Sequence, residues 1–167
     1  QDMVLGIYWL TYSEADTAND RDPSGLPIYS SIGEIERALD ETGLHMQDPI
    51  VLRVRGKQLP PEDRPEQFQG DDEAWEEFRA SGAALRIVTT AGRAIFNEAL
   101  PLDYPYINGA VTKKVAGDIV NQCADLFARW QVIEVLDAMK DLGYRNATKA
   151  GITVAISDVE TPALKVE

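Results

Sequence analysis

The periodicity of residues 131–159 constrains the fold of this chain more than any other feature. The first half places apolar residues at spacings of three and four, which predicts one buried helix face. These residues are Val132, Val135, Leu136 and Met139. Gly143 stands where a left-handed glycine would end that helix. Beyond it, Ile152, Val154 and Ile156 alternate with small or polar residues, the two-residue period of a strand. The segment therefore predicts a helix, a cationic loop and a strand.

The same two periods recur along the rest of the chain. They predict helices at residues 1–11, 31–43, 71–80, 94–100 and 112–130, and strands at residues 50–56 and 85–88. The first helix is apolar almost all round, which predicts burial on more than one side. Its helically spaced apolar residues are Val4, Leu5, Tyr8 and Trp9. The residues expected to face inward from the helix at 112–130 are Val115, Ile119, Cys123, Leu126 and Phe127. These elements predict an α+β (mixed α/β) fold, with several helices packed on short strands.

Capping residues and aromatic side chains refine two of these helices. Ser31 and Glu34 have the spacing of a capping box, and Gly43 stands at the other end of that helix. The short helix at 71–80 is expected to dock through Trp75 and Phe78.

The length and composition exclude several classes of protein. The 167 residues, 44% hydrophobic and 26% charged, are typical of one globular domain. No apolar run approaches the ~20 residues of a membrane span. Cys123 and His45 are each the one residue of their kind, which excludes an internal disulfide and a Cys/His metal cluster. A reducing, cytoplasmic setting is expected.

The net charge of −12 argues against this chain wrapping nucleic acid by itself. Much of that charge lies between residues 61 and 78, where eight acidic residues stand against Arg64 alone. They are Glu62, Asp63, Glu66, Asp71, Asp72, Glu73, Glu76 and Glu77. A solvated surface excursion explains them most simply. The alternative is a free-standing acidic interaction module that binds a basic partner.

Two weak anion-binding candidates remain, and no catalytic or metal-binding constellation stands out. Thr90, Gly92 and Arg93 precede a helix, whose N-terminus favours anions, although Thr90 as a plain N-cap explains the same residues. Arg145 and Lys149 could line an anion path or be solvated cations beside acidic neighbours. A small hydrolase using two carboxylates stays open, because the separation of carboxylates is invisible in a sequence.

Several blocks, in order, resemble the pore domain of the beta-prime subunit of bacterial RNA polymerase. They are QDMVLGIYWLT, PIVLRVR, TTAGRAIFNEALP, YPYIN, the Lys113-Lys114 pair and LGYRNATKAGITVAISDV. The quoted blocks make up about a third of the chain. Loops at about 12–30 and an acidic insertion at about 57–84 match less well and are interpreted as variable surface segments of one domain over residues 1–167.

The resemblance implies a fragment of a larger multi-domain nucleotidyltransferase that lacks the catalytic aspartates and is inactive alone. The fragment would form the wall of the secondary channel, where nucleoside triphosphates enter and the RNA 3′ end is extruded on backtracking. The implied partners are the beta, alpha and omega subunits, the rest of beta-prime and transcript-cleavage factors, with DNA reached only through the assembled enzyme. No cofactor is expected on this fragment, since another segment would hold the Mg²⁺.

The resemblance also implies roles for individual residues. Gln1 and Asp2 would lie nearest the active centre, and Arg145, Lys149 and Asp158 would face the channel. Thr90, Gly92 and Arg93 belong to a structural or channel motif. For Arg93, an internal carboxylate or backbone partner is the first expectation and channel lining the second.

Overall fold

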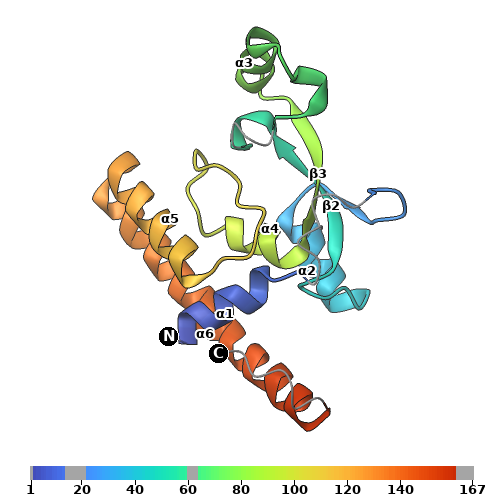
Figure 1. Cartoon of the computed structure of the whole chain (residues 1–167), viewed down its shortest axis with the longest axis vertical. Helices are drawn as coiled ribbons and strands as arrows, with labels where there is room; N and C mark the ends of the chain where they lie inside the picture. The colour runs from blue at the N-terminus through green and yellow to red at the C-terminus, as the bar shows by residue number, and fades with distance from the viewer. Residues whose placement is uncertain (1, 14–21, 60–63, 161–167) are drawn as a thin grey trace. The chain divides into compact units, whose positions relative to one another are not determined.

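The computed structural model describes residues 2–13, 22–59 and 64–160, and the chain divides into two compact units (Figure 1). The helical unit comprises Gln1–Tyr12 and Ala110–Glu167, and the sheet unit comprises Ser13–Gly109. The predicted α+β fold is confirmed, because the described residues form both helices and a three-stranded sheet. The expectation of one domain with a variable loop and an acidic insertion stays a prediction.

The helical unit contains α1 (Asp2–Thr11), α5 (Lys113–Leu126) and α6 (Arg129–Glu160). The sheet unit contains β1 (Ile28–Tyr29), α2 (Ile32–Glu41), β2 (Pro49–Arg55), α3 (Asp72–Ala80), β3 (Ala84–Thr90) and α4 (Ala91–Asn97). Among the described residues between β2 and α3 are the short 3₁₀ turns η1 (Gly56–Gln58) and η3 (Glu66–Phe68).

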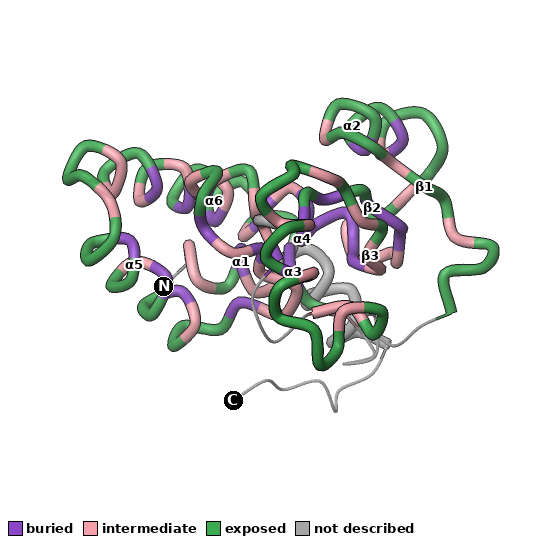
Figure 2. Tube along the Cα trace, turned by 90° about the horizontal axis from the view of Figure 1, so that it is seen from above, coloured by how far each residue is buried: buried purple, intermediate pink, exposed green. Residues whose placement is uncertain are grey.

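The sheet has the order β1-β2-β3, with β1 parallel and β3 antiparallel to β2. The strands predicted at 50–56 and 85–88 are confirmed as β2 and β3. The alternation also gives the correct inner face, since Ile50, Leu52 and Val54 all lie in the core of the sheet unit (Figure 2). Ile35 of α2 and Ala94 of α4 belong to the same core.

Local capping chemistry fixes α2 and α3. The N–H of Glu34 donates to Ser31 Oγ at 3.3 Å, and the Glu34 carboxylate accepts from the N–H of Ser30 at 2.8 Å. This is the capping-box exchange displaced by one residue. On α3, Trp75 is 1% exposed and contacts the rings of Phe68 and Phe78 at 5.3 and 6.1 Å between centroids. The predicted docking of this helix through its aromatic residues is confirmed.

The predicted loop and strand after Gly143 are wrong, because α6 runs without interruption from Arg129 to Glu160. Gly143 has no positive φ and does not end the helix. It lies instead where α6 meets α1: a Cβ on Gly143 would fall 2.5 Å from the carbonyl oxygen of Met3, and a Cβ on Gly6 would fall 1.8 Å from the carbonyl oxygen of Gly143. The glycines therefore serve close backbone packing. The short apolar alternation at 152–156 suited a strand, but such runs are equally compatible with a helix.

Two further details of the helical unit differ from the sequence predictions. In α1, the fully buried apolar residues Ile7 and Leu10 are not among the four noted for their helical spacing, of which Leu5 is 45% exposed. The helix predicted to continue to residue 130 ends at Leu126, which is 68% exposed rather than inward. The predicted burial of Ile119 and Cys123 is confirmed.

Candidate functional site

The N-terminus of α4 carries the first candidate motif, and its backbone donors are already used by the protein. Thr90 is the N-cap, accepting from the N–H of Arg93 at 3.2 Å. The N–H of Gly92 donates to the carbonyl oxygen of Met46 at 2.7 Å, and that of Ala91 to Asp48 at 3.3 Å. An anion at this terminus would have to replace all three contacts. The structure therefore supports the N-cap interpretation of Thr90.

Behind this terminus, polar side chains of residues 89–97 interlock with the segment 106–108. The guanidinium Nη1 of the buried Arg93 donates to the carbonyl oxygen of Asn108 at 3.3 Å, which confirms a backbone partner for Arg93. Asn97 donates to the carbonyl oxygen of Ile107 at 2.9 Å and accepts from its N–H at 2.8 Å. The interlock thus joins two of the blocks that carry the family resemblance.

Tyr106 adds two further contacts to the interlock, one from its hydroxyl and one from its backbone N–H. Its hydroxyl lies 3.0 Å from Thr89 Oγ1, and its backbone N–H donates to the carbonyl oxygen of Gln58. Burial raises the pKa of the Tyr106 phenol far above its usual value, against the smaller opposing effects of the Thr89 hydrogen bond and the Arg93 charge. Tyr106 is therefore a neutral structural group at physiological pH.

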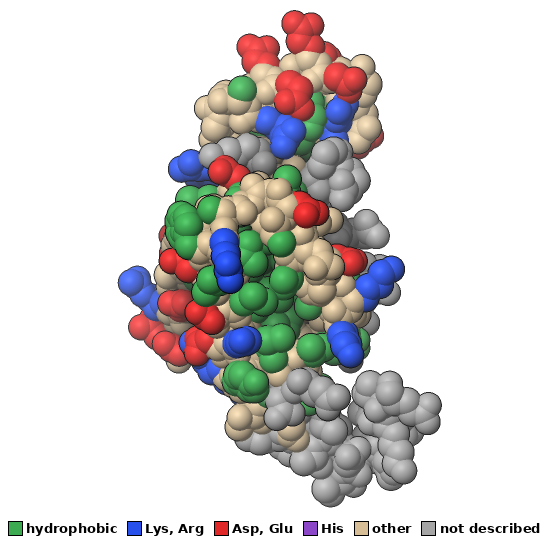
Figure 3. Space-filling model, turned by 90° about the vertical axis from the view of Figure 1, so that its left-hand side faces the viewer, with side chains coloured by type: hydrophobic (Ala, Val, Ile, Leu, Met, Phe, Trp, Pro, Cys, Tyr) green, Lys and Arg blue, Asp and Glu red, His purple; other side chains and the backbone are tan. Residues whose placement is uncertain are grey.

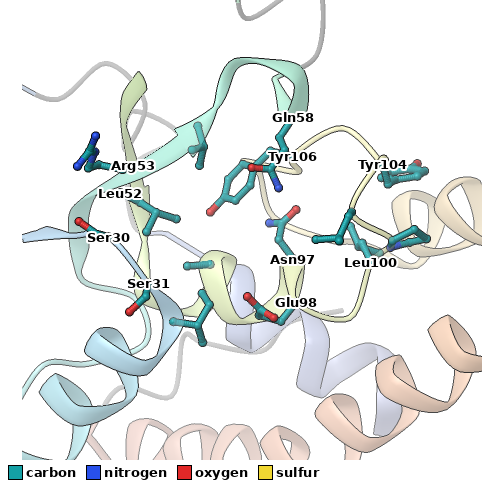
Figure 4. Close-up of a pocket in the computed structure, with 15 residues that line it drawn as sticks. Ser30, Ser31, Leu52, Arg53, Gln58, Asn97, Glu98, Leu100, Tyr104 and Tyr106 are labelled. Carbon is teal, nitrogen blue, oxygen red and sulfur yellow. The ribbon is translucent and has the colours of Figure 1, made fainter. Parts of the chain in front are cut away.

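A cavity of about 370 Å³ opens beside the interlock, between α4, β2 and the chain that follows α4. Figure 4 shows Leu52, Asn97, Leu100 and Tyr106 around it, while the side chain of Arg53 extends away. The polar groups of Asn97 and Tyr106 already bond to other parts of the sheet unit. The cavity also has polar residues in its lining, among them Ser30, Gln58 and Glu98, so its surface is mixed rather than apolar.

The cations predicted to face a channel lie on α6, within the helical unit. Arg145 is exposed and pairs with Asp141 one turn earlier on the same helix. Lys149 is also exposed. Asp158 and Asp2 fall within α6 and α1, while Gln1 lies outside the described residues. Because the loop expected at 145–149 is helical, Arg145 and Lys149 stand one turn apart on a rigid element.

The acidic segment is a surface feature of the sheet unit wherever it is described. Arg64 pairs with Asp72 at 2.5 Å and Arg79 with Glu76 at 3.2 Å, each acidic partner being largely exposed. Figure 3 shows several acidic side chains gathered at the top of the view, where α3 lies. Within the described residues, no three His, Cys, Asp or Glu side chains converge as a metal site requires. None of the described helices combines the length and apolarity needed to cross a bilayer.

Comparison with known proteins decides the family. The model of the family described as RNA polymerase Rpb1, domain 3, matches residues 1–159. This chain belongs to that family. The Rpb1 domain 3 match extends over both units, and it confirms the resemblance drawn from the sequence blocks.

Bacterial relatives of this Rpb1 domain 3 chain are named DNA-directed RNA polymerase subunit beta′. The relative from Beutenbergia cavernae is 42% identical over 167 residues, all of this chain and 12% of its own length. Those from Nocardioides sp. and Saccharopolyspora erythraea are 38% and 40% identical over 167 and 166 residues. The chain spans 12% of the length of each of these relatives.

Sequence reasoning missed three of the residues that hold the interlock together. Asn97, Asn108 and Tyr106 were not singled out, because nothing in their spacing reveals that they meet. Asn97 and Tyr106 lie inside the blocks TTAGRAIFNEALP and YPYIN, which were quoted only as matches. The short connection between these two blocks was the available signal that the blocks pack together.

Proposed function

We propose that this chain forms part of the wall of the secondary channel in the beta′ subunit of a bacterial DNA-directed RNA polymerase. Nucleoside triphosphates would enter along this wall, and the RNA 3′ end would be extruded along it on backtracking. The observation that carries the proposal is the family match over residues 1–159, together with beta′ relatives 38–42% identical over essentially the whole chain.

In this role the chain supplies shape and a few cations rather than bond-making groups. The interlock of Arg93, Asn97 and Tyr106 would keep the sheet unit rigid. Arg145 and Lys149 on α6 would raise the local concentration of triphosphate anions. The Mg²⁺ of the polymerase would be held by another segment, and the beta, alpha and omega subunits would be assembly partners.

The test uses an assembled polymerase that carries this segment. Substituting Arg145 and Lys149 by alanine is expected to raise the apparent KM for nucleotides roughly two- to fivefold, the effect of losing exposed charge contacts. It should also change the rate of cleavage of backtracked transcripts. Asp141→Ala frees the Arg145 cation from its ion pair and is expected to shift KM in the opposite direction.

Arg129→Ala, at the exposed start of the same helix, serves as the matched control. It removes one positive charge without altering the predicted channel face. Unchanged elongation and cleavage kinetics in the Arg145→Ala/Lys149→Ala enzyme would refute the channel-wall role. Family membership would be unaffected, because it rests on the sequence match.

A further inference from the structure

Three arginines gather on the outer face of the sheet in this acidic chain. In the β2–β3 register, Arg53 lies directly opposite Arg86, and Arg55 lies opposite Ala84. Side chains two residues apart on a strand point to the same face, so Arg55 shares the face of Arg53. All three arginines are exposed, whereas the opposite face of β2 is buried in the core. We call Arg53, Arg55 and Arg86 the arginine face.

In the chain by itself, repulsion between the charges of the arginine face destabilises the fold. Like charges directly opposite each other on paired strands are destabilising, and Arg53 and Arg86 are such a pair. Among the described residues, no carboxylate lies within ion-pair distance of the three guanidinium groups. Arg64 and Arg79 of the same unit, by contrast, each have an acidic partner. A bound anionic ligand would relieve this repulsion, and that relief would contribute to the binding free energy.

The edge of the sheet beside the arginine face is open. β3 is an outer strand, and its residues point their backbone groups alternately towards and away from β2. The carbonyl oxygen of Ala83 accepts from Gly56 on the β2 side, and that of Val88 accepts from the Asn108 side chain on the other. The backbone groups of Ala84 and Arg86 therefore point outward, where no described residue bonds to them.

We propose that an extended acidic segment of a partner polypeptide binds as an added strand along β3. Backbone hydrogen bonds to Ala84 and Arg86 would set its register, as in other cases of strand addition. The Cβ of an acidic residue opposite Arg86 would lie about 5 Å from the Cβ of Arg86. Its carboxylate could then contact the Arg86 guanidinium. A second carboxylate two residues along would pass over the small Ala84 side chain to reach Arg55. The recognised sequence is thus one with Asp or Glu at alternate positions.

The chemistry of the arginine face favours an acidic peptide over a single-stranded nucleic acid. Proteins that bind single strands stack the bases on aromatic side chains, and β2 and β3 contain none. The side chains that share this face with the arginines are Val51, Ala84, Val88 and Thr90. Planar guanidinium groups also match carboxylates bidentately.

The test measures binding of a fluorescent peptide with alternating glutamate and threonine to the 167-residue chain by anisotropy. Saturable binding that weakens with added salt is expected, since the contacts are exposed charges. A peptide N-methylated on the residues that face β3 should lose binding, whereas N-methylation of the intervening residues should not. Hydrogen exchange of the Arg86 amide should slow when the unmodified peptide is bound.

Substitutions separate the arginine face from general electrostatics. Arg86→Gln should weaken peptide binding roughly two- to fivefold, and Arg53→Gln/Arg55→Gln/Arg86→Gln roughly tenfold or more. Arg37→Gln on the exposed surface of α2 removes the same charge elsewhere and should leave affinity unchanged. Circular dichroism melts establish that each variant is folded.

Three results would overturn the proposal. One is an alternating acidic peptide that does not bind the folded chain. A second is affinity that the triple substitution or the β3-facing N-methylation leaves unchanged. The third is an oligouridylate that binds this face more tightly than the peptide, which would assign it to nucleic acid. None of these outcomes bears on the channel-wall proposal, since the arginine face includes neither Arg145 nor Lys149.

Discussion

The Gly6–Gly143 contact between α1 and α6 gives the sharpest test of the helical unit. A Cβ on Gly143 would lie 2.5 Å from the carbonyl oxygen and 2.7 Å from the Cα of Met3, and a Cβ on Gly6 would lie 1.8 Å from the carbonyl oxygen of Gly143. These are backbone atoms, so rotating a side chain cannot relieve the overlap. Alanine at either position therefore forces the two helices apart.

The magnitude follows from two opposing effects. Replacing glycine by alanine inside a helix gains roughly 1 kcal/mol from helix propensity. Forcing a methyl group into a closed contact costs roughly 1–3 kcal/mol, sometimes more. Because the overlap is with backbone atoms, we take the upper part of that cost and expect Gly143→Ala to lower the free energy of unfolding by about 1–2 kcal/mol net. Gly6→Ala should lower it by more, because its overlap is deeper.

Gly117→Ala on α5 is the matched control, since a Cβ there meets no atom within 4 Å. It should raise the free energy of unfolding by about 1 kcal/mol. The free energies of unfolding of Gly143→Ala and Gly117→Ala should therefore differ by about 2–3 kcal/mol, or on the order of 4–12 °C in Tm for a chain of this size.

Thermal unfolding followed by far-ultraviolet circular dichroism measures this difference. The double variant Gly6→Ala/Gly143→Ala should cost less than the sum of the single changes, because both open the same contact. If Gly143→Ala stabilises the chain as much as Gly117→Ala does, the backbones do not touch at this crossing and the reasoning is refuted.

Three further predictions concern the interlock and the buried thiol. Asn97→Ala removes the pair of hydrogen bonds to the Ile107 backbone and should lower the free energy of unfolding by about 2–3 kcal/mol in urea titrations. Because burial raises the pKa of Tyr106, the folded chain holds the phenolic proton more tightly than the unfolded chain. Stability should therefore fall as pH rises above about 10, and Tyr106→Phe should reduce that fall. Burial also raises the pKa of the Cys123 thiol, so a thiol reagent should label it slowly near neutral pH until denaturant is added.

Each of these predictions has a contrary outcome. Asn121→Ala on the exposed surface of α5 is the control for Asn97→Ala, which should have the distinctly lower free energy of unfolding. Equal free energies of unfolding would show that residues 106–108 are held by other contacts. A Tyr106→Phe profile that falls with pH as steeply as the unmodified chain would assign the alkaline loss to other groups. Rapid labelling of native Cys123 would contradict its burial.

Local chemistry in the sequence predicted β2, β3, α2 and α3 of the sheet unit, whereas the short strand β1 was not predicted. The alternation at 50–54 placed Ile50, Leu52 and Val54 on the buried face, because a strand beside a core has few other solutions. The N-caps Ser31 and Thr90 were readable because the hydroxyl bonds a backbone N–H three residues away.

Tertiary packing decided what local chemistry left ambiguous. The sequence shows a glycine at 143 but cannot say whether it ends a helix or allows another backbone to approach, since both uses need the missing Cβ. Only the position of α1 against α6 distinguishes them. In the same way, the sequence shows Arg53, Arg55 and Arg86 as separate surface residues. Strand register, which joins residues more than thirty positions apart, makes them one face.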